Sequence, residues 1–147
     1  MTNPTLGEVR QLREHVRAIR DDTPEGRTAE GSAILNAAIA AFDATAELEA
    51  VKAGYERNRA ALLKRLPQIG FDELLPVDGA FYVYVSVARF TNDAHDFASR
   101  MLNEAGVAAT PGPDFDHTRG HRYMRFSFAG TEEAIAEGIE RLAHFLK

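Results

Sequence analysis

Two short runs in which apolar and polar side chains strictly alternate limit most strongly the fold that this chain can adopt. Residues 80–87 and 123–128 each have the two-residue period of a strand with one buried face. The predicted inward set is Phe81, Val83, Val85, Met124, Phe126 and Phe128. The predicted outward set is Tyr82, Tyr84, Ser86, Tyr123, Arg125 and Ser127. If the two strands are neighbours, Tyr82, Tyr84, Tyr123 and Arg125 line one surface.

The rest of the chain is predicted to be mainly helical. We expect helices over residues 5–20, 33–42, 44–66, 94–105 and 132–145, and further short strands over 71–75 and 107–110. The expected inward side chains of the helices are Leu48, Val51, Tyr55, Leu62, Leu66, Phe97, Met101, Leu102, Ile135, Ile139, Leu142 and Leu146. After the N-terminal helices the order is β-β-α-β-β-α. This order indicates an α+β fold with helices packed on one face of a small sheet.

The N-terminal segment is predicted to be separate from this domain. Thr5 and Glu8 form a capping box that begins an amphipathic helix. Its apolar stripe is Leu6, Val9, Leu12, Val16 and Ile19. Residues 21–31 have a turn-forming composition, so the expected domains are an arm over residues 1–31 and an α+β domain over residues 32–147. The stripe needs a partner, which is either the domain or another chain.

Composition excludes several classes of function. The net charge is −5, which argues against nucleic acid and anionic membranes as partners. The chain has no cysteine, so disulfides, zinc–thiolate sites and cysteine catalysis are excluded. The first residues have no apolar run of the kind found in a secretory signal, and a cytoplasmic location is expected.

Arg125 is the main candidate binding residue. An arginine within a half-buried strand is costly unless it meets an anion. Its planar guanidinium matches the two oxygens of a carboxylate. One interpretation is therefore a carboxylate-binding residue. The other is a structural ion pair with a carboxylate of the chain, such as Asp78 or Asp114.

Other candidate residues surround Arg125 in the predicted arrangement. Tyr82, Tyr84 and Tyr123 either line a site or simply fill an amphipathic strand. The loop over residues 114–121 holds two aspartates and two histidines, His117 and His121. Their spacing suits a metal only on a helix, and Gly120 argues against a helix, so no metal site is predicted.

Three runs carry a family resemblance. They are residues 78–84 (DGAFYVY), 104–112 (EAGVAATPG) and 123–130 (YMRFSFAG). In this order they resemble the C-terminal small domain of the class I/II aminotransferases, which are fold-type I enzymes that use pyridoxal phosphate. The resemblance runs from about Ala33 to Lys147 and leaves residues 1–32 outside it. It implies that Arg125 binds the α-carboxylate of an amino-acid or keto-acid substrate.

The resemblance does not extend to the family's cofactor-binding large domain. The three lysines, Lys52, Lys64 and Lys147, lie in a charged helical stretch or at the last position. None has the Ser/Thr-rich context of the family's Schiff-base lysine, so no cofactor-binding residue is predicted in this chain alone.

Three functions follow from these observations. The first is an aminotransferase-like domain that supplies Arg125 and is not catalytically complete without a large domain. The second is a free-standing interaction module that forms homo-oligomers through its N-terminal helix. The third is a cofactor-independent enzyme that uses Arg125 with His117 and His121.

Overall fold

The computed structural model describes residues 6–147, which divide into two compact units after Val51. The predicted cap at Thr5 and the side chain of Leu6 lie outside the described part of the chain. Within residues 6–147, no helix combines the length and the apolar character needed to cross a membrane. Each unit is described in turn.

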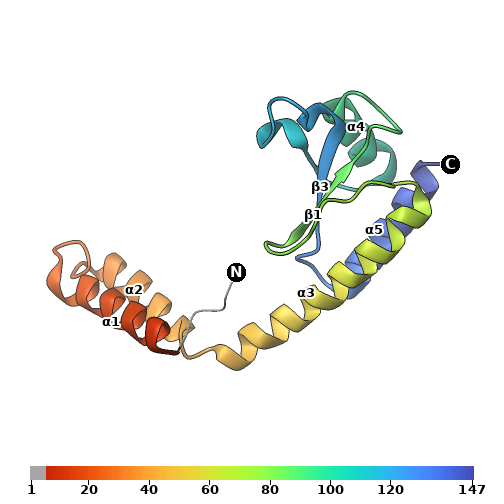
Figure 1. Ribbon diagram of the computed structural model, residues 1–147. Helices are drawn as coiled ribbons and strands as arrows, with labels where there is room; N and C mark the ends of the chain where they lie inside the picture. The colour runs from red at the N-terminus through yellow and green to blue at the C-terminus, as the bar shows by residue number, and fades with distance from the viewer. Residues whose placement is uncertain (1–5) are drawn as a thin grey trace. The chain divides into compact units, whose positions relative to one another are not determined.

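The first unit is built on a pair of packed helices, α1 (Leu6–Asp22) and α2 (Ala29–Ala41) (Figure 1). The region predicted as a linker is mostly helical or a tight turn. Helix α2 begins earlier than expected because the Thr28 hydroxyl caps it, accepting the backbone N–H of Gly31 at 3.0 Å. Arg13 and Asp43 add a two-bond ion pair at 2.7 Å for each bond.

Helix α3 (Thr45–Arg65) spans the boundary between the units. The prediction of one continuous apolar face is wrong for its first turns, where Leu48 is 59% and Val51 50% exposed. From Tyr55 onward the helix meets the core of the second unit, and Leu62 is buried there. The apolar face of α3 is therefore buried only where the helix packs on the core of the second unit.

The second unit contains a three-stranded antiparallel sheet in the order β1-β3-β2. The strands are β1 (Tyr82–Ser86), β2 (Thr110–Pro111) and β3 (Tyr123–Ser127). The predicted strand over residues 71–75 is reduced to an isolated bridge between Leu74 and Val85. Pro76 follows directly and has no N–H to extend the pairing.

The α-helices of the second unit pack on one face of this sheet. Helix α4 (Ala94–Arg100), the π-helical turn after it (Met101–Ala105) and helix α5 (Glu132–Phe145) share one apolar core with the C-terminal part of α3. Figure 1 shows α3 and α5 on the same side of β1 and β3. The sheet contributes its alternate residues Val83, Val85, Met124 and Phe126 to the core. The predicted α+β architecture is confirmed.

Besides Leu48 and Val51, two predicted inward side chains of the second unit point out. Leu102 is 53% exposed because the helix widens to a π turn at Met101, which rotates the following residues away from the core. Phe81 is 54% exposed and lies just before β1, after Ala80, whose φ is 60°.

Asn58 is the one fully buried polar residue of the described core. Its side-chain amide donates to the carbonyl oxygens of Phe128 at 3.0 Å and Gly130 at 2.9 Å. This pair of bonds ties α3 to the turn between β3 and α5. The turn ends at Thr131, whose hydroxyl caps α5 by accepting the N–H of Ala134.

Candidate functional site

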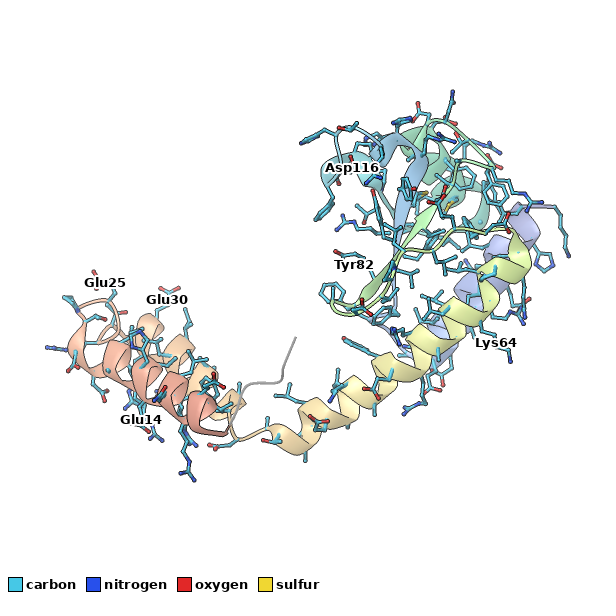
Figure 2. All side chains as sticks on the ribbon, viewed as in Figure 1. Glu14, Glu25, Glu30, Lys64, Tyr82 and Asp116 are labelled. Carbon is cyan, nitrogen blue, oxygen red and sulfur yellow. The ribbon has the colours of Figure 1, made fainter. Side chains whose placement is uncertain are left out.

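The face of the sheet away from the helices carries the predicted site residues. Antiparallel pairing places Tyr84 opposite Arg125 and Ser86 opposite Tyr123. Because side chains alternate along a strand, Tyr82, Tyr84, Tyr123 and Arg125 share this face. Figure 2 shows Tyr82 there on β1, and Asp116 in the loop before β3. These four side chains therefore lie on one surface, as the alternating pattern of the sequence predicts.

Arg125 is half-buried at the centre of this face. Its Nε atom is buried and has no hydrogen-bond partner among the described residues. Neither Asp78 nor Asp114 forms an ion pair with it in residues 6–147. A buried donor without a partner is unfavourable, by about 1–3 kcal/mol in typical cases. The position of Arg125 is thus not explained by a bond within the described chain.

Two aromatic rings lie against the Arg125 guanidinium. Its Cζ atom is 5.4 Å from the ring centroid of Tyr82 and 3.5 Å from that of Phe115. Both contacts are within the range of a cation–π interaction. The sequence gives no sign of the second contact, because Phe115 lies in a polar loop without periodicity. Only the fold brings the loop over the strand.

Tyr84 and Tyr123 stack beside Arg125, with ring centroids 5.1 Å apart and an interplanar angle of 23°. Tyr123 donates its hydroxyl proton to Glu73 at 2.8 Å, and this bond to a carboxylate raises the pKa of Tyr123. The Tyr84 hydroxyl is buried without a described partner. Burial, followed by the charge of Asp116, raises the pKa of Tyr84. Both phenols are therefore neutral near pH 7.

The loop from Gly112 to Arg122 is held closely against this face. Gly112 and Gly120 are in contact, and a Cβ atom on Gly112 would lie 2.5 Å from both the Gly120 carbonyl oxygen and the Tyr84 hydroxyl. Only glycine fits such an approach without displacement. The Asp116 carboxylate accepts the backbone N–H groups of Thr118 at 3.0 Å and Arg119 at 2.9 Å. These bonds, with that of Arg119 foremost, lower the pKa of Asp116.

The histidines of this loop do not converge on the aspartates. His117 and His121 are exposed. Within residues 6–147 there is no group of three or more His, Asp or Glu side chains placed to hold a metal ion.

The lysines do not fit the needs of pyridoxal phosphate either. Lys52, Lys64 and Lys147 are all exposed, and Lys64 projects from α3 (Figure 2). A Schiff-base lysine must reach a cofactor held inside a site. The lysines of this chain therefore do not fit a role in holding pyridoxal phosphate.

Comparison with known proteins identifies the sequence family. The family described as aminotransferase class I and II matches residues 7–142. This match includes α1, so the resemblance begins earlier than the sequence motifs indicated. The valine–pyruvate aminotransferase of Mycobacterium tuberculosis is 47% identical over 112 residues, which are 75% of this chain and 29% of that protein. The (5-formylfuran-3-yl)methyl phosphate transaminase of Methanocaldococcus jannaschii is 36% identical over 112 residues, with the same coverage.

Solved structures agree with the sequence comparison. An aminotransferase structure from Mycobacterium tuberculosis matches 75% of this chain and 29% of its own with a TM-score of 0.72 at 47% identity. A Silicibacter pomeroyi protein assigned to the aminotransferases matches 93% of this chain and 36% of its own with a TM-score of 0.75 at 41% identity. The chain spans less than a third of the length of these curated relatives. It belongs to the class I and II aminotransferase family, of which it covers a part.

Proposed function

We propose that this chain contributes the carboxylate-binding arginine of an aminotransferase, and that Arg125 is that residue. The observation that carries the proposal is that Arg125 forms no ion pair within residues 6–147 and that its buried Nε has no partner there. The Nε atoms of Arg13 and Arg65 are also buried without a partner, but the terminal nitrogens of these residues pair with Asp43 and Glu140. A half-buried guanidinium without such a pair favours an anion from outside the described chain. A carboxylate matches both the charge and the planar donors of the guanidinium.

The surroundings of Arg125 support an amino-acid or keto-acid ligand. Tyr82, Tyr84 and Tyr123 form an aromatic surface beside the cation. Such a surface leaves the positive charge of Arg125 uncompensated by the groups that touch it. Aromatic rings also offer apolar contact to the carbon chain of a small acid. These three tyrosines are the proposed lining residues.

Calorimetric titration of the full chain with pyruvate tests this proposal. Binding is expected in the wild-type chain and is expected to be lost in Arg125→Ala. Arg122→Ala is the matched control, because Arg122 is a nearby exposed cation on the turn before β3. Equal binding by the wild-type chain and Arg125→Ala would contradict the assignment.

We also propose that the chain is not catalytically complete alone. Its three exposed lysines and its coverage of less than a third of the relatives support this statement. Titration with pyridoxal phosphate is expected to give no visible absorbance band of a lysine-bound cofactor at a defined site. A saturable band that disappears on changing one of Lys52, Lys64 or Lys147 would show the opposite.

A second candidate function is an interaction module that self-associates through α1. The observation in its favour is that Leu12 is 56% and Ile19 38% exposed on that helix. Exposed apolar stripes on helices are commonly covered by another surface. This function does not exclude the first one.

A further inference from the structure

The loop residue Phe115 makes a close contact that the proposed binding role of Arg125 does not by itself require. The ring centroid of Phe115 is 3.5 Å from the Arg125 Cζ atom, so the ring and the guanidinium are in van der Waals contact. Tyr82 lies farther away, at 5.4 Å. Phe115 is therefore the principal aromatic neighbour of the cation.

The position of Phe115 is not explained by burial in the core. Its side chain is 63% exposed, the second most exposed of the large apolar side chains in the described chain after Ile34. Leaving this much apolar area in water is unfavourable. Core packing therefore does not explain the position of the ring, whereas the contact with Arg125 does.

The surrounding loop holds Phe115 in place. The backbone N–H groups of Phe115 and Asp116 both donate to the Gly112 carbonyl, at 2.9 and 3.0 Å. The N–H of Gly120 donates to the Asp116 carbonyl at 2.8 Å. With the close approach of Gly112 to Gly120, these bonds fix the backbone on both sides of the ring. The ring is thus presented to Arg125 by an ordered turn.

From this arrangement we infer that Phe115 is a positioning residue for Arg125. The ring covers one face of the guanidinium and restricts rotation of its plane. Guanidinium N–H donors lie in the plane of the group, so a ring over one face leaves the terminal donors free to bind a carboxylate. Restricting the plane before binding reduces the entropy lost when the carboxylate binds. This inference rests on the proposed function of Arg125.

The test compares pyruvate binding by wild-type chain, Phe115→Leu and Phe115→Tyr. Loss of an exposed cation–π contact is expected to raise the Kd of Phe115→Leu about two- to fivefold. Phe115→Tyr keeps an aromatic face and is expected to retain the wild-type Kd. Phe81→Leu is the matched control, since Phe81 is 54% exposed and touches Tyr82 rather than Arg125.

A nuclear magnetic resonance measurement on the same variants reports the contact directly. The stacked ring shifts the resonances of the Arg125 side-chain protons upfield. This shift is expected in the wild-type chain, Phe115→Tyr and Phe81→Leu, and is expected to be lost in Phe115→Leu. A merely structural role of Phe115 would be shown by Phe115→Leu losing the shift while keeping the wild-type Kd.

The outcomes separate this inference from the proposed function. If the wild-type chain does not bind pyruvate, the carboxylate function of Arg125 is wrong and the inference falls with it. If the wild-type chain binds and Phe115→Leu binds with the same Kd, the function stands and the positioning role alone is overturned.

Discussion

The Asp116 side chain forms three hydrogen bonds within the loop that carries Phe115. Its carboxylate accepts the N–H groups of Thr118 and Arg119 and a side-chain bond from Arg119 Nε at 3.2 Å. These bonds favour the ionised form and lower the pKa of Asp116. The stabilisation is present above the ordinary aspartate pKa, and it is lost as the pH falls through the lowered pKa of the folded state.

The lowered pKa of Asp116 predicts the outcome of an acid titration. Amide resonances of Thr118 and Arg119 are expected to shift with a midpoint below about 3.9, the ordinary value for aspartate. In Asp116→Ala the inflection is expected to disappear, and both amides should exchange faster with solvent. Asp114→Ala, an exposed neighbour in the same loop, should leave both amides unchanged. A midpoint at or above the ordinary value would show that the two N–H bonds are not formed.

Among the residues of the candidate site, those on the strands can be predicted from the sequence, whereas Phe115 on the loop cannot. Alternation places Arg125 and Tyr84 on one face because side chains of a strand point to opposite sides. No such rule applies to Phe115, whose neighbours are polar and whose backbone follows a 3₁₀ turn. Its contact with Arg125 depends on the close approach of Gly112 and Gly120, which is a tertiary feature.

The two hydrogen bonds between Asn58 of α3 and the turn after β3 predict how much this contact between elements stabilises the fold. Replacing Asn58 by Ala removes the donors to the Phe128 and Gly130 carbonyls inside the core. The expected loss of unfolding free energy is about 1–3 kcal/mol. Urea denaturation followed by circular dichroism measures this loss.

Glu56→Ala is the control for that measurement, because Glu56 is exposed on the same helix. Its effect is expected to stay within about 0.5 kcal/mol. An Asn58→Ala chain as stable as the Glu56→Ala chain would mean that the two bonds do not hold the turn to α3.

The ends of elements differ in how far the sequence determines them. The caps at Asp93 and Thr131 and the helix end at Gly106 depend on local backbone chemistry, which is why the ranges expected for these helices agree with the structure at these ends. The direction of Leu102 could not be predicted, since the π turn at Met101 breaks the 3.6-residue period on which the prediction rests. The bridge at Leu74 likewise depends on its pairing with Val85, which no local pattern reveals.

For the whole molecule, the exposed stripe on α1 predicts self-association. Light scattering over a concentration series is expected to show oligomers of the full chain and a shift toward monomer in Leu12→Glu. The physical reason is that a charge within an apolar contact is costly to bury. Leu102→Glu is the control, as Leu102 is equally exposed at 53% but lies in the second unit. A monomer at every concentration, or the same shift in both variants, would argue against this role of α1.

Arg125 differs from Arg13 and Arg65, whose Nε atoms are also buried without a partner, because it forms no ion pair within residues 6–147, and we expect it to bind a carboxylate ligand. The most direct measurement follows the arginine Nε–H resonances of the full chain by nuclear magnetic resonance as pyruvate is added. We expect one saturable shift, at Arg125, and only small unsaturable changes at exposed arginines such as Arg119 and Arg122. Similar changes at all arginines, or none at Arg125, would contradict carboxylate binding by Arg125.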